Sequence, residues 1–236
     1  MAERRAAGRG VARGAAALLV LLVLVVAPAR GDERVDITAT DGVQLVGHLA
    51  GSDGPGIVFG HMYPADQRSW TSFAEEMAKA GFRTLTFDFR GYGESGGEKN
   101  VAAIDRDMEG AYRFMIGRKI RPVYVAGASM GGTAALIVAA RVPVAGVATL
   151  SAPVAFRGLD ATSSLGALTM PKLFIASADD APAAAAVKEL VARSPEPKTL
   201  TVVPGTAHGT DLFTGDQAGT VKEALRAFFQ PHPADR

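Results

Sequence analysis

Short apolar runs alternate along this chain with longer segments whose apolar residues recur at helical spacing. The apolar runs are bounded by glycine, proline or polar residues, which is typical of buried strands. We expect strands at 56–61, 82–89, 122–127, 144–153, 172–177 and 198–205. We expect helices at 69–81, 100–117, 131–142, 182–194 and 215–230. Strands that alternate with helices predict a mostly parallel sheet with helices on both faces, so the expected fold class is α/β.

The segment 35–51 departs from this alternation, because two strand-like runs flank the dipeptide Asp41-Gly42. An Asp-Gly pair between two such runs indicates a β-hairpin. We therefore expect an antiparallel hairpin that extends one edge of the sheet, within a single domain that spans 30–236.

The first 29 residues have the composition of a secretory signal peptide. Four arginines precede a purely apolar run at 15–27, and "APA" follows at 27–29. The apolar run is shorter than the roughly 20 residues that span a bilayer. We predict cleavage after Ala29 and a secreted or periplasmic protein; an uncleaved N-terminal anchor is the alternative.

The charge balance and the absence of cysteine exclude several classes of protein. The formal net charge is +1 for the whole chain and about −2 without residues 1–29. A nucleic-acid-binding domain normally carries a basic face, which this balance does not supply. With no cysteine in the chain, disulfides, thiolate catalysis and cysteine-ligated metal sites are excluded.

The stretch "GASMG" at 127–131 places Ser129 between a predicted strand and a predicted helix. G-x-S-x-G in that context is the pattern of a nucleophile raised on a sharp strand-to-helix turn. The strained turn leaves room only for small neighbouring side chains, which explains the glycines. The alternative is that Ser129 is a small residue of a glycine-rich loop and has no catalytic role.

A serine nucleophile needs a base, and the base needs a partner that orients it. The histidines of the chain are His48, His61, His208 and His232. We favour His208 as the base, because it directly follows the last predicted strand and sites of parallel sheets form at the carboxyl ends of strands. Asp179 and Asp180 follow the preceding strand, so one is expected to orient His208 while the other caps the next helix.

With these residues in view, the chain resembles the α/β-hydrolase family over its whole length after the leader. Besides "GASMGG" and "AHG", it has "FGHMYPADQRSW" at the family's H-G-x oxyanion loop and "DFRGYGESGG" at the D-x-R-G-x-G-x-S stretch. The opening "DGVQLVGHL" and the ending "HGTDLF" are similar to the serine-peptidase-like and dienelactone-hydrolase-like branches. The resemblance places Ser177 at a family glycine three residues before the acid, which favours Asp180 over Asp179.

The resemblance also implies an oxyanion hole made of two backbone N–H groups. One is expected from Met130, directly after the nucleophile. The second is expected from Tyr63, with Met62 as the alternative, because Met62 stands where the family usually has glycine. His61 is expected to brace this loop and not to transfer protons.

Several further residues are interpreted as structural. Asp88 and Arg90 are expected to hold a loop near the site by hydrogen bonds. Trp70 and Phe73 are expected to pack in the core. The adjacent pair "DD" lacks the clustered histidines of a metal site, so no metal or organic cofactor is implied.

Only a short segment, 154–171, separates the strands that would flank a helical cap domain. We expect a loop and a short helix there, no cap, and an open pocket. The predicted function is hydrolysis of an ester or related acyl bond, in a small-molecule or polymer-linked substrate, through an acyl-enzyme on Ser129. The alternatives are a peptidase or aminopeptidase with the same triad, and a binding protein of this fold without activity.

Overall fold

An eight-stranded sheet with the order β1-β2-β4-β3-β5-β6-β9-β10 forms the centre of the computed structural model, which describes residues 1–2 and 32–230. Its strands are β1 (Glu33–Thr38), β2 (Gln44–Ala50), β3 (Gly56–Gly60), β4 (Arg83–Phe87), β5 (Val123–Ala128), β6 (Gly146–Leu150), β9 (Lys172–Ser177) and β10 (Lys198–Val203). The six strands from β4 to β10 in this order are parallel to one another, whereas β1 pairs antiparallel with β2 and β2 antiparallel with β4. The predicted mostly parallel sheet is confirmed.

The predicted hairpin forms one edge of this sheet. Thr38 lies opposite Gln44, and the chain turns at Gly42. Gly42 has a φ of 92°, which glycine adopts at little steric cost because it lacks a Cβ atom. Ala39 N donates to Val43 O and closes the turn. The hairpin is therefore held by local contacts and joins the sheet through the pairing of β2 with β4.

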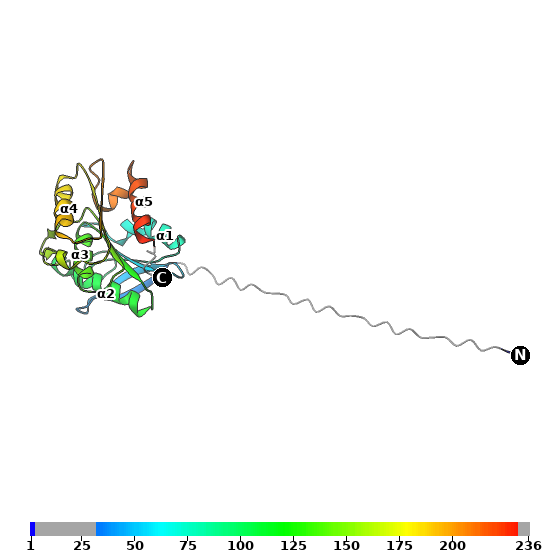
Figure 1. Cartoon of the computed structure of the whole chain (residues 1–236). Helices are drawn as coiled ribbons and strands as arrows, with labels where there is room; N and C mark the ends of the chain where they lie inside the picture. The colour runs from blue at the N-terminus through cyan, green and yellow to red at the C-terminus, as the bar shows by residue number, and fades with distance from the viewer. Residues whose placement is uncertain (3–31, 231–236) are drawn as a thin grey trace.

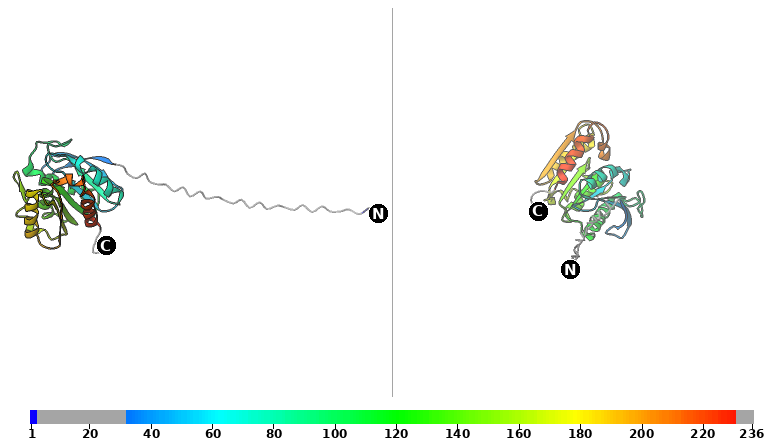
Figure 2. Two further views of the ribbon diagram at one scale, coloured as in Figure 1. Left: turned by 90° about the horizontal axis from the view of Figure 1, so that it is seen from above. Right: turned by 90° about the vertical axis from the view of Figure 1, so that its right-hand side faces the viewer.

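Helices cover both faces of the sheet, and each face has its own apolar core (Figure 1). The helices are α1 (Thr71–Lys79), α2 (Ile104–Gly117), α3 (Met130–Ala139), α4 (Ala181–Arg193) and α5 (Ala218–Phe229). Apolar side chains of α2, α3 and α4 belong to one core, and those of α1 and α5 belong to the other. Figure 2 shows α1 and α5 on the face turned to the viewer in its right-hand view.

Strands β3, β5, β6 and β9 are buried along their whole length, as expected for parallel strands that lie between two helix layers. All residues of α3 are buried as well, because this helix packs on the sheet and is covered by α2 and by a small hairpin. The centre of the molecule therefore holds both β5 and α3 rigidly, and the turn between them is Ser129.

Three parts of the predicted arrangement differ in the structure. The expected helix at 100–117 is divided into the 3₁₀ turn η2 (Val101–Ala103) and α2. The expected helix at 69–81 is divided into a 3₁₀ turn, η1 (Gln67–Trp70), and α1, because Asp66 accepts a hydrogen bond from Arg68 N and starts the turn early. Between β6 and β9 the short helix is replaced by a hairpin of β7 (Ala155–Phe156) and β8 (Leu159–Asp160), followed by the 3₁₀ turn η3 (Leu165–Ala167).

In the described part of the chain there is no helical cap domain between β6 and β9, as predicted. The predicted signal peptide falls outside the described residues except for Met1 and Ala2, and so does His232. None of the helices in the described ranges is both long enough and apolar enough to span a membrane.

Candidate active site

Ser129 is the turn residue between β5 and α3, and its backbone is strained. Its φ of 49° and ψ of −119° lie in a region that non-glycine residues rarely adopt. Ser129 N donates to Leu150 O at 2.8 Å, and Ser129 O accepts from Gly132 N at 2.9 Å. Hydrogen bonds to β6 and into α3 thus hold the serine in a conformation that it would not adopt alone.

The glycines that flank Ser129 are required by close packing on both sides of the turn. A Cβ atom on Gly127 would lie 2.2 Å from Gly131 C, and one on Gly131 would lie 2.4 Å from Gly60 O. Gly60 is the last residue of β3, so the turn and the end of β3 are in direct contact. The G-x-S-x-G pattern therefore reflects two backbone contacts that a side chain would disrupt.

Ser129, His208 and Asp180 are joined by hydrogen bonds at the carboxyl ends of three strands. His208 Nε2 lies 2.9 Å from Ser129 Oγ, and His208 Nδ1 lies 2.6 Å from Asp180 Oδ2. Because a carboxylate only accepts, Nδ1 carries the proton and Nε2 is free to accept from the serine hydroxyl. The residues predicted as nucleophile, base and acid are thus brought together in one chain of contacts.

Ser129, Asp180 and His208 differ in their exposure to solvent. The Asp180 side chain is 11% exposed and the His208 side chain 41% exposed, while Ser129 as a residue is 8% exposed. The carboxylate is thus largely shielded from water, whereas the imidazole is open to solvent. A substrate that approaches the imidazole from solvent therefore meets the hydroxyl bound to it.

The loop that carries His208 is held by residues at the end of β9. Ser177 Oγ donates to Ala207 O at 2.6 Å, directly before the histidine. Asp179 binds the loop twice, since its N donates to Gly205 O at 2.9 Å and its Oδ2 accepts from Gly205 N at 3.2 Å. Sequence reasoning missed this use of Ser177, although a serine at a family glycine position was a visible departure.

These contacts correct one expectation about the aspartate pair. The aspartate that does not contact His208, Asp179, was expected to cap the following helix. Neither aspartate does so: Asp180 precedes α4 without a side-chain capping bond, and Asp179 turns to Gly205. The Asp179 carboxylate binds the His208 loop instead, because the backbone N–H of Gly205 lies beside it.

The predicted oxyanion donors lie on two different elements. Met130 is the first residue of α3, so its N–H has no acceptor within the helix. The N–H groups of Met62 and Tyr63 donate no hydrogen bond to other described residues. The Met62 side chain reaches the loop of the base, because a Cβ on Gly209 would lie 2.6 Å from Met62 Sδ. Both residues therefore stay candidates for the second donor.

His61 braces this loop as predicted. Its Nδ1 donates to Met62 O at 3.0 Å, and its Nε2 accepts from Phe89 N at 3.1 Å. Since one nitrogen donates and the other accepts, the ring is neutral, and burial lowers the pKa of His61. His61 therefore ties the end of β3 to the segment after β4 and has no nitrogen left for proton transfer.

Trp70 supports the same loop from the other face of the sheet. Its Nε1 donates to Gly60 O at 2.9 Å, and its ring stacks on Phe59 with centroids 4.7 Å apart. Phe73 is buried against Phe59, with ring centroids 6.0 Å apart. The packing roles predicted for Trp70 and Phe73 are confirmed.

Asp88 and Arg90 organise the glycine-rich loop after β4. Asp88 accepts from Gln67 N, from Gln67 Nε2 and from Glu94 N, each at 2.9 Å. Arg90 binds Asp107 and Asp41 with its guanidinium, and its side chain is only 7% exposed. The structural interpretation of both residues is therefore confirmed.

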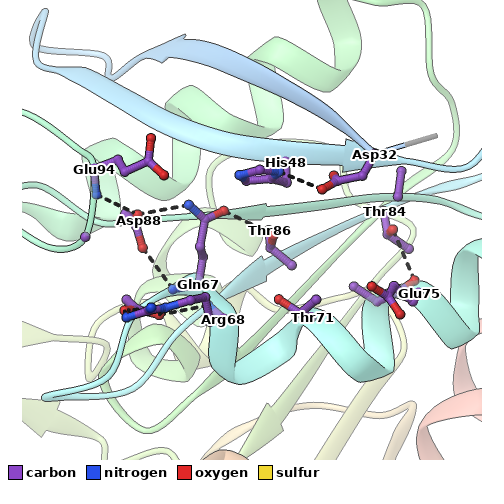
Figure 3. Close-up of a pocket in the computed structure, with 14 residues that line it drawn as sticks. Asp32, His48, Gln67, Arg68, Thr71, Glu75, Thr84, Thr86, Asp88 and Glu94 are labelled. Carbon is purple, nitrogen blue, oxygen red and sulfur yellow. Dashed lines mark hydrogen bonds and ion pairs between the residues drawn. The ribbon is translucent and has the colours of Figure 1, made fainter. Parts of the chain in front are cut away.

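A cavity of about 530 Å³ lies beside α1 on the β2–β4 side of the sheet (Figure 3). His48 and Asp32 point toward one another at its wall, with Nδ1 and Oδ2 2.8 Å apart. None of Ser129, Asp180 and His208 lines this cavity. It is therefore separate from the hydrogen-bonded serine.

Within the described residues, no cluster of three or more histidine, aspartate or glutamate side chains is placed to hold a metal ion. Ser129, His208 and Asp180 are joined by hydrogen bonds between their own side chains. The chemistry of this arrangement is removal of a proton from a hydroxyl group by an oriented imidazole.

Known proteins resemble this chain in sequence and in fold. It is 27% identical over 221 residues to the uncharacterized protein Rv2307c of Mycobacterium tuberculosis, a match that covers 82% of this chain and 78% of that protein. A Pyrococcus furiosus esterase superposes with a TM-score of 0.70 at 20% identity, covering 84% of this chain and 91% of its own. A dienelactone hydrolase of Anabaena variabilis superposes with a TM-score of 0.71 at 21% identity, covering 84% and 96%.

The family comparison covers the part of the chain that contains the nucleophile turn. Residues 55–174, just over half of the sequence, match the family described as alpha/beta hydrolase fold. This range runs from β3 through Ser129 into β9. The chain therefore belongs to the alpha/beta hydrolase fold family.

Proposed function

We propose that this protein is a serine hydrolase that cleaves a carboxylic ester through an acyl-enzyme intermediate. The observation that carries the proposal is the chain of two hydrogen bonds from Ser129 Oγ through His208 to Asp180. The esterase-like fold of the structural neighbours supports an ester as the substrate class.

In the first half of the reaction, His208 Nε2 takes the proton of Ser129 as Oγ attacks the ester carbonyl carbon. Asp180 stabilises the imidazolium through Nδ1–H. The N–H groups of Met130 and Tyr63 donate to the oxyanion of the tetrahedral intermediate. The carbon–oxygen bond to the alcohol then breaks, and the alcohol leaves with the proton from His208.

In the second half, water replaces the alcohol. His208 accepts a proton from a water molecule as the water oxygen attacks the acyl carbon, and a second tetrahedral intermediate forms. The bond to Ser129 Oγ breaks, and His208 returns the proton to Oγ. The products are a carboxylic acid and an alcohol, and the enzyme is regenerated without any other reactant.

Labelling with a fluorophosphonate probe tests the nucleophile and the base. We expect covalent labelling of the wild type, none of Ser129→Ala, and a loss of at least about 10³-fold in rate for His208→Ala. His48→Ala is the matched control, because His48 also pairs with an aspartate but lies outside the site. Labelling of Ser129→Ala at the wild-type rate would refute the proposal.

We also propose that the protein is exported and that the signal is removed after Ala29. The basic residues followed by the apolar run at 15–27 and "APA" support this. N-terminal sequencing of the exported protein should begin at Arg30. An exported protein that still begins at Met1 contradicts the cleavage.

A further inference from the structure

The β7–β8 hairpin places an arginine next to the proposed oxyanion loop. The guanidinium carbon of Arg157 lies 4.3 Å from the centre of the Tyr63 ring and 5.3 Å from that of Phe156. Arg157 and Gly158 are the two turn residues between Phe156 and Leu159, and their φ values of 48° and 86° are those of a tight two-residue hairpin turn. The turn thus sets the Arg157 guanidinium over the Tyr63 ring at the tip of the hairpin.

The hairpin is anchored beside the nucleophile. Thr133 Oγ1, in the first turns of α3, donates to Pro153 O at 2.7 Å, two residues before β7. β7 and β8 both contact α3. Tyr63, under Arg157, directly follows Met62, whose side chain contacts the loop of His208. Arg157 therefore stands at the rim of the proposed active site.

A buried hydroxyl group lies close to the same position. Tyr92 is 3% exposed, and its hydroxyl makes no hydrogen bond with any described residue. Its ring lies 5.0 Å from that of His61, at the base of the oxyanion loop. Burial raises the pKa of Tyr92. Tyr92 and Arg157 contact two residues of the same loop, His61 and Tyr63.

The cations at this rim have no anionic partner among the described residues. Lys99 Nζ lies 4.6 Å from the centre of the Tyr92 ring. Neither Lys99 nor Arg157 forms an ion pair within the described part of the chain, whereas Arg34, Arg90 and Arg113 do. A guanidinium that stacks on an aromatic face keeps its N–H edge free for a carboxylate.

We propose that Arg157, with Lys99 and the Tyr92 hydroxyl, forms a subsite for a substrate carboxylate, so that the favoured substrates are esters that carry a negative charge. The inference rests on the proposed function. A carboxylate matches the planar fork of Arg157, and a neutral alkyl group would leave this charge without a partner. The subsite binds the substrate and takes no part in proton transfer.

Paired substrates test this subsite. The kcat/KM of mono-4-nitrophenyl glutarate, whose free carboxyl is ionised at pH 7.5, is divided by that of 4-nitrophenyl valerate, which is neutral and of equal length. We expect a ratio of about tenfold in the wild type, the factor that about 1.4 kcal/mol gives. Arg157→Gln should bring the ratio near one, chiefly through the KM of the glutarate.

The variants are chosen so that the charge change has a matched control. Arg118→Gln removes the same charge from a residue paired with Glu33 and placed beside Pro122, at the opposite end of β5 from Ser129. It should keep the wild-type ratio. Tyr92→Phe removes only the hydroxyl and should lower the ratio severalfold.

The outcomes separate the two proposals. If valerate hydrolysis depends on Ser129 but the wild type does not favour the glutarate, the subsite is refuted and the proposed function stands. If Arg118→Gln lowers the ratio as much as Arg157→Gln, the preference reflects the overall field and the subsite is again refuted. If neither ester is hydrolysed faster than in buffer alone, or if Ser129→Ala keeps the enzyme-catalysed rate, both proposals fail.

Discussion

Replacing Gly131 with alanine tests the contact between the nucleophile turn and the oxyanion loop. The new Cβ would lie 2.4 Å from Gly60 O and 2.6 Å from His61 O, whereas ordinary contacts begin at about 3.4 Å. Both oxygens belong to backbone that cannot rotate away. The segment 60–61 must therefore move by roughly 1 Å relative to the turn, since overlaps of this size are strongly repulsive.

The effect on catalysis should exceed the effect on folding. Overpacking costs about 1–3 kcal/mol. Alanine in place of glycine within α3 offsets up to about 1 kcal/mol of this through its higher helix propensity. A shift of roughly 1 Å between the two oxyanion donors, however, can lower the rate about 10²-fold. We therefore expect a folded protein with severely reduced activity.

The assay is kcat/KM for 4-nitrophenyl valerate, measured beside urea unfolding. Gly219→Ala is the control, because Gly219 lies in α5 and a Cβ there meets no atom within 4 Å. It should keep full activity and unfold at equal or higher urea concentration. If Gly131→Ala retains kcat/KM within about threefold of the wild type, the position of the oxyanion loop does not depend on its contact with the turn, and the reasoning is refuted.

Three further predictions concern carboxylates. Asp180→Asn should lower kcat for ester hydrolysis by at least about 10³-fold, and Asp179→Asn should lower it far less. Equal losses in the two variants would contradict the assignment of Asp180 as the partner of His208. Asp107→Ala leaves Arg90 buried without its inner partner and should lower the free energy of unfolding by about 3–5 kcal/mol in urea. Arg90 lowers the pKa of Asp41 to about 2 in the folded protein. The ionised Asp41 therefore stabilises the fold fully above about pH 4, and this contribution is lost as the pH falls toward 2. In Asp41→Asn, the free energy of unfolding should decline less steeply with falling pH, as acid unfolding curves will measure.

Much of the fold was predictable because the deciding signals are local. Strand β9 was predicted with its observed bounds, since it is a short apolar run between a proline and polar residues. Asp41-Gly42 specified the hairpin through turn geometry alone. The position of Ser129 was predictable because a strained turn admits only certain neighbours, and those neighbours are adjacent in sequence.

Other features depend on partners that are distant in sequence. Asp179 and Asp180 are chemically identical neighbours, and only the approach of the 205–208 loop assigns one to Gly205 and the other to His208. The hairpin at 155–160 replaced an expected helix because its few residues pack on α3, which outweighs weak local preference. Tertiary contacts decide these features, because the competing local conformations differ little in free energy.

The sequence by itself determined the α/β layering, the nucleophile turn and the family resemblance, because hydrophobic period and backbone sterics act within a few residues of chain. Tertiary structure alone decided which carboxylate meets the imidazole, how Ser177 holds the residue before His208, and that Arg157 stacks over Tyr63 at the rim of the site. These contacts join segments that lie on different strands and loops. Their distances are set by the packing of the whole sheet and its helices, which no local pattern encodes.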